Sequence, residues 1–247
     1  MRTLLLLFIL LAGVFAAQGQ FVCFSDSIAI YESPGTDLPA IEGAAIFEVE
    51  GYKVIVGGVL TDPDMPGEEG IYNCDMLVVD YTAKKTYILP LSFFPPGVAD
   101  QFSAARFCYT ADKDTAYIMG GYGYDWAASY ETTLPLMTIF PIKTLIDSVV
   151  LHKDYFDLFE VVYDNRLAVT EGNLIRIGAY FLVYNGREIT PVVDEYTDRR
   201  TVNEWNFQGQ LRKFALKNTA GYREVDEFQV CYNSRVFYQC MPDKWRP

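Results

Sequence analysis

The stretch KDTAYIMGGYGYDWAASY, residues 113–130, runs from a hydrophobic segment into the glycine doublet Gly120-Gly121 and then into aromatic residues. The same order occurs earlier in GYKVIVGGVLTDPD, residues 51–64, where the doublet is Gly57-Gly58. A dinucleotide-binding loop needs the spacing G-x-G-x-x-G at the start of a helix, and neither stretch has it. We interpret the doublets as structural: they end strands at points where a side chain would collide with a neighbouring backbone.

Three segments place a strand, a tight turn, a second strand and the doublet position in the same order. They are GAAIFEVEGYKVIVGGV from Gly43, SAARFCYTADKDTAYIMGGY from Ser103 and RLAVTEGNLIRIGAYFLVYNG from Arg166. The doublet position falls at residues 57, 120 and 184, at intervals of 63 and 64, and in the third segment Tyr184-Asn185 occupies it. This regular interval indicates a repeated supersecondary unit. We expect a distorted third unit, because tyrosine adopts a left-handed backbone poorly.

The first doublet and the following YNCDMLVVDYTAKKTY, residues 72–87, resemble a kelch repeat, and residues 28–228 resemble secreted bacterial kelch-like proteins with long repeats. The resemblance implies an all-β, kelch-like β-propeller of four-stranded antiparallel blades. The expected repeats span about 43–91, 103–150 and 166–227, and 228–247 would begin a further blade or form an irregular tail. Helical spacing occurs near Ile142–Val150, for which we expect one short helix between two blades.

About three to four blades make an incomplete propeller, whose open strand edges invite self-association. A truncated reading frame, a small closed ring and a ring completed by oligomerisation are the three alternatives.

Composition supports a β-rich exported protein. Aromatic residues make up 15% of the 247 residues, which favours strands. MRTLLLLFILLAGVFAAQG, residues 1–19, has the layout of a secretory signal peptide cleaved before Gln20, and no later segment is long enough to span a membrane. We therefore expect an exported protein in the periplasm, at the cell surface or outside the cell.

The net charge of the chain limits the classes of partner that it can bind. The net charge of −12 becomes −13 when Arg2 is removed with residues 1–19, and such a surface repels nucleic acid. An unknown protein or a glycan is the expected partner.

Export permits disulfides, and Cys231 and Cys240 could close a short loop. The odd count of five cysteines leaves one thiol over, and the alternative is that several are simply buried.

The loops after the doublets are the expected binding surface, chiefly residues 122–130 and 187–209. Aromatic and charged side chains there can stack on a sugar or anchor a protein, although in propellers such residues also fill the gaps between blades. The candidate binding residues are Tyr122, Tyr124, Asp125, Trp126, Tyr130, Arg187 and Glu188.

Catalytic and metal sites have weaker candidates. Copper sites of the kind found in some kelch-fold enzymes need several imidazoles, and the chain has only His152. A sialic acid mutarotase would need converging arginine and carboxylate groups, for which Arg106, Arg166 and Glu171 are candidates. Asp62, Asp64 and Glu68 lie in an acidic loop that could attract Ca²⁺, or could simply be solvated. We expect no cofactor.

The sequence therefore predicts a non-catalytic scaffold that binds protein or glycan. The alternatives are a carbohydrate-active enzyme of the mutarotase type and a truncated fragment without independent function.

Overall fold

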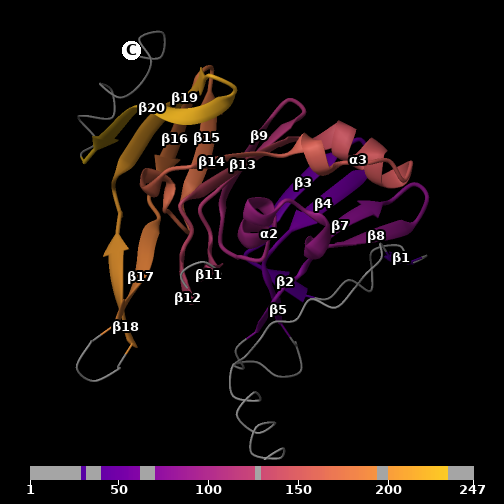
Figure 1. Ribbon diagram of the computed structural model, residues 1–247, viewed down its shortest axis with the longest axis horizontal. Helices are drawn as coiled ribbons and strands as arrows, with labels where there is room; N and C mark the ends of the chain where they lie inside the picture. The colour runs from indigo at the N-terminus through magenta and orange to yellow at the C-terminus, as the bar shows by residue number, and fades with distance from the viewer. Residues whose placement is uncertain (1–28, 32–39, 62–69, 126–128, 194–199, 233–247) are drawn as a thin grey trace, which may run out of the picture.

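The computed structural model describes residues 29–31, 40–61, 70–125, 129–193 and 200–232. These residues form antiparallel sheets and two short α-helices, which confirms the predicted all-β, blade-like architecture. Figure 1 shows three main sheets side by side, as in part of a propeller, running from the indigo N-terminal sheet to the yellow C-terminal one.

Each main sheet contains four strands in meander order, and the first gains a fifth strand at its edge. The first sheet consists of β3 (Ala45–Val49), β4 (Tyr52–Val56), β7 (Asp75–Asp80), β8 (Lys85–Pro90) and the added β1 (Ala29–Tyr31). The second consists of β9 (Cys108–Asp112), β10 (Thr115–Met119), β13 (Leu136–Pro141) and β14 (Glu160–Tyr163). The third consists of β15 (Asn173–Ile177), β16 (Tyr180–Tyr184), β19 (Leu211–Thr219) and β20 (Tyr222–Cys231).

A smaller sheet interrupts each blade after its second strand, and all three extend from the same end of the molecule (Figure 1). These are the three-stranded β2 (Ala40–Glu42), β5 (Val59–Thr61) and β6 (Ile71–Tyr72), the hairpin β11 (Tyr122–Asp125) with β12 (Tyr130–Thr133), and the hairpin β17 (Arg187–Val193) with β18 (Arg200–Asn206). We call this end of the molecule the hairpin end.

The helix at Ile142–Val150 is present as α3. It joins β13 to β14 of the second sheet, and its buried face packs in the core between the first and second sheets. Its apolar face, including Leu145 and Val149, is buried in the core. The connection between the first two sheets instead carries α2 (Pro96–Phe102), which begins at a proline. Short 3-10 turns occur at Leu91–Phe93, Phe156–Leu158 and Asn165–Leu167.

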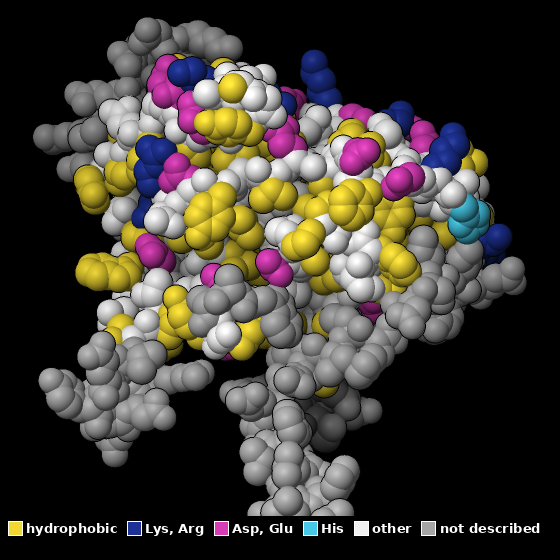
Figure 2. All heavy atoms as spheres, viewed as in Figure 1, with side chains coloured by type: hydrophobic (Ala, Val, Ile, Leu, Met, Phe, Trp, Pro, Cys, Tyr) yellow, Lys and Arg dark blue, Asp and Glu magenta, His cyan; other side chains and the backbone are white. Residues whose placement is uncertain are grey.

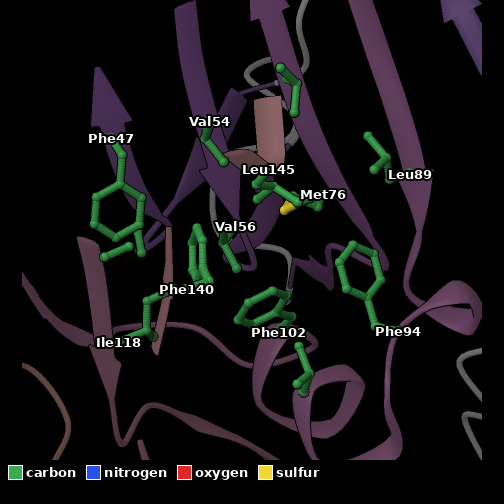
Figure 3. Close-up of a cluster of buried hydrophobic side chains, with 14 of the residues drawn as sticks. Phe47, Val54, Val56, Met76, Leu89, Phe94, Phe102, Ile118, Phe140 and Leu145 are labelled. Carbon is green, nitrogen blue, oxygen red and sulfur yellow. The ribbon is translucent and has the colours of Figure 1, made fainter. Parts of the chain in front are cut away.

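Two hydrophobic clusters fill the spaces between neighbouring sheets. The larger lies between the first and second sheets under both helices, and Figure 3 shows Phe102 and Phe140 facing Val56 within it. The rings of Phe102 and Phe140 pack edge to face with centroids 6.0 Å apart. The smaller cluster joins the second and third sheets through Phe181 and its neighbours. Burying each such side chain contributes roughly 1.5–3 kcal/mol, so face-to-face packing holds the blades together.

The third doublet is Asn185-Gly186, one residue later than the predicted Tyr184-Asn185. The first doublet positions, Gly57, Gly120 and Asn185, have φ values of 63°, 64° and 60°, and Gly186 has φ 97°. Each pair directly follows the second strand of its blade. Asparagine tolerates the left-handed region that tyrosine avoids, so the third doublet keeps the backbone conformation of the other two. The third blade does have a register shift between Lys213 and Ala215, where β19 pairs with β20.

Both glycine doublets run against backbone of the next blade. A Cβ atom added to Gly57 would lie 2.4 Å from the carbonyl oxygen of Ala104, and one added to Gly120 would lie 1.8 Å from that of Val169. The second glycine of each pair donates its N–H to the same carbonyl, Gly58 at 2.8 Å and Gly121 at 3.2 Å. Close approach and a positive φ together account for glycine at these positions.

Candidate functional site

Three residues in left-handed conformation link the blades at the hairpin end. Gly43, Arg106 and Glu171 each lie two residues before the first strand of a blade, and their φ values are 69°, 60° and 60°. The N–H of Arg106 donates to Gly43 O at 2.7 Å, and the N–H of Glu171 donates to Arg106 O at 2.8 Å. A non-glycine residue in this conformation costs roughly 1–2 kcal/mol, so the surrounding structure must hold Arg106 and Glu171 there.

The side chains of these residues enter an array of alternating charges. A carboxylate oxygen of Glu171 lies 3.2 Å from Arg106 Nη1 and 2.5 Å from Arg187 Nη2. Arg187 Nη1 lies 3.0 Å from a carboxylate oxygen of Glu204. Hydrogen bonds to Glu171 and then to Glu204 raise the pKa of Arg187. Two blades and the β17–β18 hairpin therefore meet in one set of ion pairs.

Two tyrosines and a further glutamate lie beside the arginines. The hydroxyl of Tyr122 donates to Glu131 Oε2 at 3.3 Å. Burial, followed by the charge of Glu131, raises the pKa of both Tyr72 and Tyr122, while the nearby Arg106 lowers each slightly. Both phenols are therefore protonated at neutral pH and act as hydrogen-bond donors. We call the whole set the polar cluster: Tyr72, Arg106, Tyr122, Glu131, Glu171, Arg187 and Glu204.

The repeated backbone explains how these residues meet. Tyr122 and Arg187 each follow a doublet and begin a hairpin. Tyr122 pairs with Ala105 and Arg187 pairs with Thr170, the residues just before Arg106 and Glu171. Each pairing fixes the start of a hairpin against the entry of its own blade. Because Glu171 N–H also bonds to Arg106 O, equivalent positions in successive repeats converge.

The polar cluster is accessible to a ligand. The side chain of Arg106 is 51% exposed and that of Glu171 is 39% exposed. A guanidinium has five N–H donors in a planar fork, and Glu171 contacts only one terminal nitrogen of Arg106. The arrangement can offer donors to a carboxylate or to the hydroxyls of a sugar, while the glutamates accept hydrogen bonds.

The structure brings together four of the candidate residues and separates others. Arg106, Glu171, Tyr122 and Arg187 belong to the polar cluster. Arg166 does not: it pairs with Asp164 at 2.6 Å and donates to the backbone oxygen of Val225 at 3.1 Å.

The remaining binding candidates lie in the two hairpins. Glu188 follows Arg187 on β17 and therefore projects from the opposite face, where burial raises its pKa and Arg212 partly offsets the rise. Tyr124, Asp125 and Tyr130 are partly buried in the β11–β12 hairpin. Trp126 lies outside the described residues.

Sequence reasoning missed Glu131 and Glu204 and treated Tyr72 only as part of a repeat motif. Each lies on the return strand of a small sheet: Tyr72 pairs with Val59, Glu131 with Tyr124 and Glu204 with Ile189. The register of those hairpins was the signal that would have found them.

No group of three or more His, Cys, Asp or Glu within the described ranges is placed to hold a metal ion. The acidic loop with Asp62, Asp64 and Glu68 lies outside those ranges. His152 is exposed just after α3, and Figure 2 shows the histidine in cyan at the surface. Among the described residues, no helix has the length and apolar character needed to span a membrane.

The described cysteines fall into two kinds. Cys74 and Cys231 are disulfide-bonded, whereas Cys108 is a free thiol that is 0% exposed. Burial raises the pKa of the Cys108 thiol to about 12. The predicted pairing of Cys231 with Cys240 involves a residue outside the described ranges.

Comparisons with known proteins name no family for this chain. No protein-family model matches the chain, and no curated protein matches it. A solved structure titled "Structure of YjhT" is similar, with a TM-score of 0.39 and 10% sequence identity, covering 83% of this chain and 68% of that one. None of these findings names a ligand for this chain.

Proposed function

We propose that this chain is an exported, kelch-like binding module that recognises a protein or glycan at its hairpin end without catalysing a reaction. The observation that carries the proposal is the convergence of charged and phenolic side chains from successive repeats on one accessible site. Binding surfaces commonly lie on loops held by a rigid scaffold, and the three blades provide such a scaffold.

The chemistry of the polar cluster suits a ligand with several hydrogen-bonding groups. Arg106 offers N–H donors, Tyr72 and Tyr122 offer hydroxyls, and the glutamates offer acceptors. Sugars carry neighbouring hydroxyls and peptide segments carry neighbouring amides, so both kinds of ligand present donors and acceptors close together. The acidic net charge of −12 disfavours a polyanion such as nucleic acid.

The test is a screen of glycan and peptide arrays, followed by calorimetric titration of each hit. The variant Arg106→Gln removes the most exposed guanidinium of the cluster, and we expect it to weaken binding about tenfold or more, because hydrogen bonds to charged groups contribute about 1.5–3 kcal/mol. Arg166→Gln is the matched control, because Arg166 is similarly exposed and ion-paired but lies outside the cluster. Equal affinity of the two variants for the hit would contradict the proposal.

A mutarotase activity is the second candidate, because Arg106, Glu171 and Arg187 converge. Interconversion of sugar anomers requires a proton to leave the anomeric hydroxyl and another to reach the ring oxygen as the ring opens. Two guanidiniums could hold the carboxylate of a sialic acid while a glutamate accepts the proton.

NMR magnetisation transfer between the two anomers of sialic acid measures this exchange directly. An exchange rate above that of buffer, lost in Glu171→Gln, supports the enzyme. A rate equal to that of buffer at high protein concentration excludes it and leaves the binding module as the proposed function.

A further inference from the structure

The outer edge of β18 has no partner strand among the described residues. Within those residues β18 pairs with β17 alone, and Figure 1 shows the hairpin standing at the side of the molecule away from the first sheet. Residues 202–206 are all exposed, with Val202 at 63% and Trp205 at 62%. Such an edge is a template for another strand.

Hydrogen bonds elsewhere in the hairpin show which backbone groups point outward. Arg187 exchanges both its backbone hydrogen bonds with Thr170, and Ile189 bonds to the side chains of Thr132 and Thr133. Both residues therefore turn their polar groups away from β18. Facing residues of an antiparallel pair alternate between bonded and non-bonded pairs.

The partners of these residues on β18 must then also point away from β17. Asn206 faces Arg187 and Glu204 faces Ile189, so their N–H and C=O groups point to the free edge. By alternation, Val202 and Arg200 do the same. Opposite Val202 stands Pro191, which has no N–H and fits a non-bonded pair.

We propose that this edge binds β18 of a second copy of the chain, antiparallel and centred on Val202. In this register Val202 faces Val202 of the second copy, and position 200 of each copy faces Glu204 of the other. The three facing pairs all present outward polar groups, so each can exchange both hydrogen bonds. By sequence, position 200 is basic and position 204 is acidic, and opposite charges at facing register positions are favourable.

Other registers lack this complementarity. Centring on Glu204 places two carboxylates opposite one another, and like charges in facing positions destabilise a strand pair. Centring on Asn203 places Glu204 opposite valine and position 200 opposite Asn206. The charges of β18 therefore select Val202 as the centre.

The test is sedimentation velocity on the purified protein, recovered after secretion by an expression host and studied over a wide concentration range. An interface of one short strand is well below the usual ~1,600 Å² of stable complexes, so we expect a reversible dimer in the micromolar range or weaker. Val202→Lys places two like charges at the axis and is expected to weaken the dimer at least about tenfold. Val192→Lys makes the same change in the same hairpin on β17, and it should leave dimerisation unchanged.

Two further variants test the geometry. Val202→Pro removes only an outward N–H, so the hairpin ladder stays intact and a thermal melt should show a folded chain while the dimer weakens roughly tenfold or more. Arg200→Glu places like charges opposite one another and should also weaken the dimer. A chain that is monomeric throughout the range, or a dimer that Val202→Lys and Val192→Lys weaken equally, overturns the proposal. The dimer test changes residues outside the polar cluster and the ligand test changes Arg106, so the two proposals are tested by separate variants.

Discussion

Replacing Gly120 with alanine gives a direct measure of how tightly neighbouring blades approach. The new Cβ atom would lie 1.8 Å from the carbonyl oxygen of Val169 and 2.8 Å from its carbonyl carbon. Real atoms cannot be this close, so the backbone of one blade must move away from the other. The hydrogen bond from Gly121 N–H to Val169 O, now 3.2 Å long, would be strained as well.

The expected cost has three sources. Left-handed backbone costs alanine roughly 1–2 kcal/mol relative to glycine, overpacking adds about 1–3 kcal/mol, and weakening one hydrogen bond adds ~0.5–1.5 kcal/mol. We therefore expect Gly120→Ala to lower the free energy of unfolding by about 2.5–6.5 kcal/mol in total.

Gly209 supplies the matched control. It has φ 74° and nothing within 4 Å of its added Cβ, so Gly209→Ala carries the left-handed cost of about 1–2 kcal/mol alone. Both changes reduce the entropy of the unfolded chain equally, and that contribution cancels in the comparison. Urea unfolding of both variants measures the difference. If Gly120→Ala is no more destabilising than Gly209→Ala, the close approach of the blades is not what requires glycine.

Three further predictions concern titratable groups. Burial raises the pKa of Glu188 in the folded state, so ionisation costs stability as pH rises above its unfolded value; Glu188→Gln should raise the urea midpoint at pH 7, with the gain vanishing near pH 4. A hydrogen bond from Arg166 lowers the pKa of Asp164, which therefore adds stability above its usual pKa and loses it in acid; Asp164→Asn should lower the urea midpoint at pH 7 but have little effect near pH 2. Cys108 should resist iodoacetamide in the native chain at pH 8 and react after unfolding, as peptide mass spectrometry can show, because its thiol is buried and its pKa is raised to about 12.

Local pattern predicted the strands well and the connections poorly. The apolar runs that end at Val56 and Met119 are short and bounded by turn residues, so their strand character could be read directly. The third doublet was placed one residue early because the run AYFLVYNG has no glycine pair to mark its end. Only the backbone angles of Asn185 and Gly186 show where that strand stops.

The position of the helix in the sequence was predicted correctly, but the strands that it joins could not be. Its periodicity reports a buried face, and this says nothing about which strands the helix joins. Strand β14 follows α3 and returns to the same sheet, beyond the predicted repeat end at residue 150. The α2 segment was missed because PGVADQF offers a single turn of apolar spacing after two prolines.

Four residues of the candidate site could be predicted from the sequence. Arg106 and Glu171 could be singled out because each lies at a strand entry, and Tyr122 and Arg187 because each follows a doublet. Their mutual contact depends on how one repeat sits against the next, which no local pattern encodes. Arg166, like Arg106, is an arginine before the first strand of a blade, but its guanidinium pairs with the carboxylate of Asp164.

Because Arg106 has a left-handed backbone, its replacement by glycine is expected to change stability and ligand binding in opposite directions. Arg106→Gly would relieve an unfavourable conformation, and it would also delete the most exposed cation of the polar cluster. A chain selected only for thermal stability could therefore drift toward glycine here, as Gly43 already stands at the equivalent position of the first blade. If relatives of this protein retain arginine at this position, selection has favoured the contacts of the side chain over the stability of the fold.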